Sequence, residues 1–139
     1  MTRYVDPERA RFGAFRRLPD DGPVHMLNLV RLRNRAAYAD GRETTGAEAY
    51  QAYGRESARI FKRVGGRIVW SGDFALMLIG PEDEVWDHCF IAEYPSARAF
   101  VAMVKDPAYQ DAVIHRQAAV EDSRLIRLSP RANGESFGS

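Results

Sequence analysis

The order of helix-like and strand-like segments constrains the fold of this chain more than any other feature of its sequence. Residues 24–32, VHMLNLVRL, alternate with a period of two and predict a strand that is largely apolar on both faces. A helix follows, because Thr45 and Glu48 have the spacing of a capping box. The glycines at 65–66 end this helix, since glycine adopts a left-handed cap without a side-chain clash.

The second half of the chain repeats this order of elements. We expect a strand with a bulge at Ser71–Gly72, a second strand, a helix that is interrupted and restarted at Asp106–Pro107, and a final strand. In the same order, these segments cover residues 67–79, 85–94, 95–104 continuing from 107, and 123–128. A further short helix is expected over residues 6–18, with Asp6 as its cap and Pro7 at its first position.

The resulting pattern, βαββαβ, is that of an α+β ferredoxin-like unit with a four-stranded antiparallel sheet and an extra N-terminal helix. Both core helices then cover one face of the sheet, and the other face is bare. Because that face is apolar, a second copy of the chain is its simplest cover, so we expect a homodimer. The chain is expected to be one domain, with a helix and turn at 1–22, a core at 23–128 and a mobile tail at 129–139.

Composition limits the partners and the compartment. Among 139 residues, 20 are Lys or Arg and 19 are Asp or Glu, so the net charge is +1 and no basic stripe indicates nucleic-acid binding. Cys89 is the single cysteine and cannot form an internal disulfide, which favours a reducing, cytoplasmic setting. No apolar stretch approaches the roughly 20 residues of a membrane span, so we expect no membrane partner.

Several stretches in combination resemble domain-of-unknown-function family 1330. They are MLNLVRLR, GAEAYQAYG, RVGGRIVWSG, LIGPEDEVWD, EYPSARAF and KDPAYQDAVIHR. The similarity as a whole extends from about Pro23 to Leu128. The resemblance implies a dimeric α/β-barrel built from ferredoxin-like protomers, but it brings no established reaction. The N-terminal helix and the 33–46 loop are additions to the shortest form of the family. Related dimeric barrels include cofactor-independent monooxygenases, lactone isomerases and haem enzymes, which is an analogy of fold alone.

Asn28 is the polar residue that stands out in the first strand, because a buried amide without partners costs about 1–3 kcal/mol. If Leu27 and Leu29 face the helices, Asn28 faces the interior of the barrel. The antiparallel neighbour at 85–94 then has His88 on the same side. We therefore expect Asn28 and His88 to line one cavity and to contact a substrate.

Two aromatic residues are candidates for the same cavity. Trp70 is expected to join it from the bulged strand, although a lone tryptophan is more often part of a core. Tyr53 lies on the packing face of the first core helix, with its ring in the core or its hydroxyl in contact with a ligand. The alternative for the whole group is structural: Asn28 bonds a helix end or a loop, and His88 bonds a neighbour.

The stretch DPAYQDAVIHRQAAVEDSRLI contains adjacent His115 and Arg116. In a functional interpretation Arg116 binds a substrate carboxylate and His115 transfers a proton. In the structural interpretation, which we favour, His115 pairs with Asp111, and Arg116 pairs with Asp122 or Glu121 as the helix turns into the last strand.

No metal or cofactor is expected, because His25, His88 and His115 do not have metal-ligand spacing and no phosphate-binding or nucleophile motif is present. The first hypothesis is a small enzyme that binds a partly apolar organic molecule in a cleft between the sheet and the dimer partner. His88 and His115 are its catalytic candidates, for proton transfer or cofactor-free oxidation. The alternatives are a binding or sensing module without turnover and a purely structural dimer.

Overall fold

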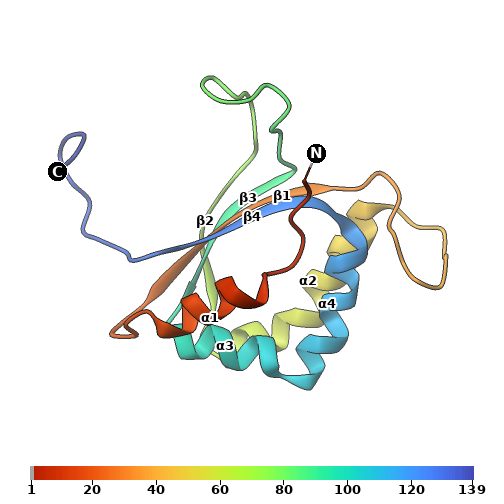
Figure 1. The fold of residues 1–139 in the computed structure, drawn as a ribbon, viewed down its shortest axis with the longest axis horizontal. Helices are drawn as coiled ribbons and strands as arrows, with labels where there is room; N and C mark the ends of the chain where they lie inside the picture. The colour runs from red at the N-terminus through yellow and green to blue at the C-terminus, as the bar shows by residue number, and fades with distance from the viewer. Residues whose placement is uncertain (1) are drawn as a thin grey trace.

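The structure is a computed structural model that describes residues 2–139. In chain order its elements are α1 (Arg9–Arg17), β1 (Val24–Leu32), α2 (Gly46–Arg63), β2 (Arg67–Gly72), β3 (His88–Tyr94), α3 (Ala97–Lys105), α4 (Pro107–Ala119) and β4 (Val120–Leu128). The strands form one four-stranded sheet in the order β2-β3-β1-β4, and every neighbouring pair is antiparallel. All the helices lie on one side of this sheet (Figure 1). The predicted α+β, ferredoxin-like βαββαβ fold with an extra N-terminal helix is confirmed.

Local capping explains where the core helices begin. The hydroxyl of Thr45 accepts the backbone N–H of Glu48, and the Glu48 carboxylate accepts the backbone N–H of Thr45, so the predicted capping box of α2 is present. The carboxylate of Asp106 accepts the backbone N–H of Ala108 at 2.8 Å and starts α4, with Pro107 in its first turn. The predicted interruption at Asp106–Pro107 therefore separates two helices, α3 and α4.

The N-terminal helix begins later than expected. It starts at Arg9, and Glu8 precedes it without a side-chain cap. Asp6 is not the cap, because its carboxylate accepts the side-chain amide of Gln117 on α4 at 3.3 Å. The expected bounds of 6–18 were therefore wrong at the N-terminal end, because Asp6 contacts α4 instead of capping α1.

The second strand is shorter than expected. We predicted a strand over 67–79, but β2 ends at Gly72, which is paired with Cys89 near the start of β3. Residues 85–87, expected in the next strand, turn away instead, and the backbone N–H of Asp87 donates to Val30 at 2.7 Å. Residues 73–87 therefore form a loop, because none of them pairs in register with a strand of the sheet. The irregularity in β2 falls between Ile68 and Trp70 rather than at Ser71–Gly72.

The burial of the strand residues shows which face of the sheet packs against the helices. On β1 the buried side chains are Val24, Met26 and Val30, and on β3 they are Ala92 and Tyr94. These side chains, except Val30, pack with residues of α2, α3 and α4, among them Ile60, Phe100 and Tyr109. Even-numbered residues of both strands thus face the helices.

Leu27 and Leu29 consequently lie on the bare face, which reverses the orientation assumed from the sequence. The bare face also carries Ile91, Ile126 and Leu128, which are opposite or beside them in the strand register. Across residues 2–139, no helix has the length and apolar character that crossing a membrane requires.

Candidate functional site

Aromatic side chains from α2 and α4 gather over the sheet. The ring of Tyr50 stacks on His88 with centroids 4.9 Å apart and planes 22° apart. The hydroxyls of Tyr53 and Tyr109 share a hydrogen bond of 2.8 Å, and the rings of Tyr50 and Tyr53 are 5.6 Å apart. Burial raises the pKa of Tyr50 and of Tyr109 above the ordinary value for a phenol. These hydroxyls are therefore neutral near pH 7 and able to donate hydrogen bonds.

Asn28 lies in the middle of the helix-covered face, opposite Phe90 on β3 and Leu125 on β4. Its side-chain amide donates to the backbone carbonyl of Met26 at 3.0 Å. The partner is therefore a carbonyl of the same strand, and not the helix end or loop that the structural alternative expected. The centre of this face is less closely covered than its ends, since Asn28 and Phe90 are only partly buried and Leu125 is 40% exposed. Met26 and Val30, on either side of Asn28 along β1, are buried.

His88 and Asn28 are on the same face of the sheet, because His88 is opposite Val30 and Phe90 is opposite Asn28. That face is the one against the helices and not the bare one. Trp70 is opposite Ile91 and is 52% exposed on the bare face. The structure therefore brings Asn28, His88 and Tyr53 to one side of the sheet and leaves Trp70 on the other.

Arg116, in the last turn of α4, extends over the same face as Asn28. Its guanidinium donates to the backbone carbonyl of Val5 at 2.5 Å and to the hydroxyl of Ser123 at 3.3 Å, and Ser123 is opposite Val30. Within residues 2–139 the guanidinium meets these neutral oxygens and no carboxylate.

The expected pairing of Arg116 with Asp122 or Glu121 was wrong. Asp122 is on the bare face, where it pairs with Arg124 at 2.9 Å, and Glu121 is 3.5 Å from Arg31. These neighbouring arginines already neutralise both carboxylates, so neither of them is available to Arg116 on the other side of the strand.

His115 belongs to a separate cluster. Its Nδ1 is 2.6 Å from the Tyr38 hydroxyl and its Nε2 is 2.8 Å from a Glu56 carboxylate oxygen. The expected pairing with Asp111 was wrong, because the ring instead bridges the 33–45 loop and α2. Burial raises the pKa of the Tyr38 phenol. No local sequence pattern indicates these contacts, since Tyr38 and His115 are 77 positions apart.

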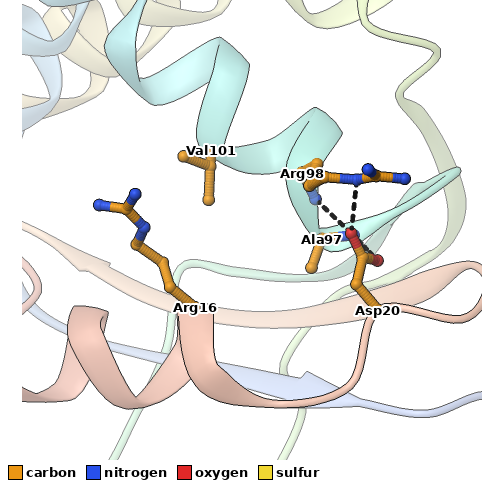
Figure 2. A pocket seen from close by; sticks show the side chains of 5 residues that line it. All are labelled: Arg16, Asp20, Ala97, Arg98 and Val101. Carbon is orange, nitrogen blue, oxygen red and sulfur yellow. Dashed lines mark hydrogen bonds and ion pairs between the residues drawn. The ribbon is translucent and has the colours of Figure 1, made fainter.

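Two shallow hollows lie along α1 and contain none of the predicted site residues. The hollow in Figure 2, about 410 Å³, is lined by Arg16, Asp20, Ala97, Arg98 and Val101. A second of about 480 Å³ is lined by Pro7, Arg9, Phe12, Gly13, Arg16 and Val104.

The polar groups of the first hollow already satisfy one another. The Asp20 carboxylate accepts the backbone N–H groups of Ala97 and Arg98, at 2.7 and 3.1 Å, and pairs with the Arg98 side chain. The Ala97 N–H lowers the pKa of Asp20. We therefore interpret Asp20 as stabilising the N-terminus of α3 together with its N-cap residue, Ser96. In the described part of the chain, His, Cys, Asp and Glu side chains do not gather into a group able to hold a metal.

Comparison with known proteins identifies the family. The model of a domain of unknown function, DUF1330, matches residues 36–127. The chain belongs to this family. No curated protein matches this DUF1330 chain.

Solved structures agree with that assignment. The crystal structure of the methylated RPA0582 protein is 65% identical, covers 97% of this chain and 100% of its own, and has a TM-score of 0.94. The RPA0582 protein of unknown function from Rhodopseudomonas palustris is also 65% identical over 95% and 100% of the two chains, with a TM-score of 0.91. SnoaB, a cofactor-independent oxygenase from Streptomyces nogalater, is 16% identical over 84% and 100%, with a TM-score of 0.53, which is a likeness of fold alone.

Proposed function

We propose that this DUF1330 protein is a homodimer whose protomers each bind a small, partly apolar organic acid between the sheet and helices α2 and α4. The observation that carries the proposal is the guanidinium of Arg116, a permanent charge whose hydrogen-bond partners among residues 2–139 are the Val5 carbonyl and the Ser123 hydroxyl. A carboxylate forms stronger, paired hydrogen bonds with a guanidinium than these neutral oxygens do. The guanidinium has five N–H donors and uses two of them here, so a carboxylate can bind to the remaining donors or replace the Val5 carbonyl.

The side chains around Arg116 suit the rest of such a ligand. In the strand register, His88 and Ser123 flank Val30, and Asn28 is the next residue on that face of β1. Tyr50 stacked on His88 offers an aromatic surface opposite the charged group. The neutral phenols and the side-chain amide of Asn28, which has hydrogen-bonding capacity beyond its bond to Met26, supply hydrogen bonds in between. The cleft we propose is thus between the sheet and the helices, instead of between the sheet and the partner.

For chemistry, we propose that His88 transfers a proton. Its ring is exposed and makes a stacking contact with Tyr50. His115 is less suited to this role, because both its ring nitrogens already contact Tyr38 and Glu56. Binding without turnover is the alternative, and cofactor-free oxidation by the same site is a third outcome that product analysis distinguishes.

The homodimer is proposed to form through the bare face of the sheet. Support comes from its apolar side chains, which none of the helices covers: Leu27, Leu29, Trp70, Ile91, Ile126 and Leu128. Exposed apolar patches of this kind mark interaction sites. We keep the cytoplasm as the proposed location, because the chain has a single cysteine.

The first experiment is native mass spectrometry of freshly purified protein, followed by identification of any released molecule. A dimer that carries a reproducible organic acid supports the proposal, whereas a monomer contradicts the homodimer. Binding of benzoate, used as a probe, is then measured by NMR titration in the wild type, in Arg116→Gln and in Arg55→Gln, a control at an exposed arginine of α2.

We expect Arg116→Gln to weaken benzoate binding at least about tenfold, the scale of one charged hydrogen bond, and Arg55→Gln to leave it unchanged. Equal affinity in both variants would refute the carboxylate site. His88→Ala then separates catalysis from binding: with the identified molecule as substrate, it should abolish turnover and weaken binding much less than Arg116→Gln does. Retained turnover would exclude His88 as the proton carrier.

A further inference from the structure

The loop between β2 and β3 exposes apolar side chains that residues 2–139 of the protomer leave uncovered. We name residues 73–80, DFALMLIG, the apolar arm. Leu76, Leu78 and Ile79 in this arm are 73%, 83% and 91% exposed. Single exposed apolar residues are ordinary on a protein surface, but a run of this kind marks an interaction site.

The backbone of the apolar arm is also unpaired within the part of the chain that the structure describes. Among the described residues, its N–H and C=O groups make no hydrogen bond to the rest of the chain. At the end of the arm Gly80 has a φ of +144°, and a side chain there would meet Met77. The chain can therefore reverse direction at Gly80 and return to the sheet.

The returning part of the loop is fixed to the bare face. Arg31 donates to the backbone carbonyl of Asp83 at 2.9 Å, and Arg124 pairs with Glu84 at 3.0 Å. Both arginines lie on the bare face, and Arg124 also lies over the ring of Trp86, which is buried. The base of the loop is thus held, while the arm rises from the end of β2 on the side of the sheet away from the helices (Figure 1).

We propose that the apolar arm packs onto a second copy of the chain when that copy covers the bare face. This inference rests on the proposed homodimer and adds to it the element by which each protomer holds the other. The arm and the bare face adjoin and have the same apolar character, so one partner covers both. In a two-fold dimer each copy supplies an arm and receives one.

The charges on the bare face favour a second copy over a charged partner. At one end, Glu93 pairs with His25 at 2.8 Å and with Arg67 at 2.9 Å. At the other end, Arg31 and Arg124 pair with Asp122 and with acidic groups of neighbouring segments. Because these charges are paired within the protomer, the face has no unbalanced patch to attract an opposite charge, and an identical face meets no net repulsion.

Sedimentation velocity over a range of protein concentrations tests the proposal. The variant replaces Leu76, Leu78 and Ile79 together with serine, and the matched control is Phe137→Ser, which removes a fully exposed aromatic ring from the tail. We expect the arm variant to raise the dimer Kd about a hundredfold or more, because three apolar side chains lose their burial, and the control to keep the wild-type Kd. Far-UV circular dichroism should be unchanged in both, since the arm lies outside the sheet and the helices.

If the arm variant dimerised with the wild-type Kd, the proposed arm contact would be refuted and the proposed homodimer would still stand. A wild type that is monomeric at every concentration would instead overturn the homodimer on which this inference rests. Hydrogen exchange of the wild-type dimer gives a second measurement that needs no variant. We expect the amides of residues 74–79 to exchange slowly, and exchange at the rate of an unstructured peptide would contradict the arm contact.

Discussion

The hydrogen bond between Tyr53 and Tyr109 gives a quantitative test of the packing between α2 and α4. Its length is 2.8 Å, Tyr109 is buried and Tyr53 is partly buried. Tyr53→Phe leaves the buried hydroxyl of Tyr109 without a partner, which costs about 1–3 kcal/mol of unfolding free energy. Tyr109→Phe should cost less, because the Tyr53 hydroxyl that remains can still reach water.

The double variant should recover part of this loss, because it removes both hydroxyls and leaves neither unpaired. We expect a coupling free energy of about 1 kcal/mol between the two sites, measured by urea unfolding of the four proteins at one protomer concentration. In thermal unfolding, 1 kcal/mol corresponds to roughly 3–5 °C for a chain of this size. Losses that add within about 0.5 kcal/mol would refute the direct hydrogen bond, since independent sites behave in that way.

Three further contacts have measurable consequences. Thr45→Ala removes the cap of α2 and should cost about 1 kcal/mol of unfolding free energy, measured by urea unfolding. Asp20→Asn should lower the melting temperature at pH 7. The backbone N–H of Ala97 is the main group that lowers the pKa of Asp20 below its ordinary value of 3.8. The ionised Asp20 therefore stabilises the fold fully above the pKa that it has in the unfolded chain, and this stabilisation is lost as the pH falls through its lower pKa in the folded protein. The deficit of the variant should therefore shrink below about pH 4, and a constant deficit would contradict this cause. His115→Phe should speed amide exchange in residues 33–45, because it removes the contact with Tyr38, and unchanged exchange would show that the backbone bonds alone hold the loop.

Local chemistry made several elements predictable from the sequence. The capping box at Thr45 and Glu48 and the restart at Asp106–Pro107 depend on residues within a few positions of one another, so the sequence contains all that forms them. The βαββαβ order follows in the same way from periodicity. The end of β2 was not predictable, because FALMLI has the composition of a strand and lacks only a neighbouring strand, which is a property of the whole fold.

The site was harder to predict because its contacts are distant in sequence. Val5 and Arg116 are 111 positions apart, so nothing local indicates that a backbone carbonyl occupies that guanidinium. The sequence also does not determine which face of β1 meets the helices, because both faces are apolar. Alternation divides the residues into two sets without showing which set the helices cover. Met26 and Val30 are buried in the structure, and their set includes Asn28. The shared face of Asn28 and His88 did follow from the period of two and antiparallel pairing.

Trp70 shows how one extra residue in a strand changes the sheet face on which a side chain lies. Ile68 is opposite Ala92, but Trp70 is opposite Ile91, so the extra residue in β2 turns the tryptophan from the helix-covered face to the bare face. Its ring lies over Gly72, where a side chain would collide with it.

The roles of the two faces are therefore separable by experiment. We expect Trp70→Ser to raise the dimer Kd at least about tenfold and to leave benzoate affinity unchanged, because the ring contributes only to the bare face. Asn28→Ala should do the reverse, since Asn28 lies between the sheet and the helices. Sedimentation velocity and NMR titration on both variants decide between the faces. If Trp70→Ser weakened benzoate binding and kept the dimer, the tryptophan would belong to the ligand site, and the separation of a binding face from an association face would be wrong.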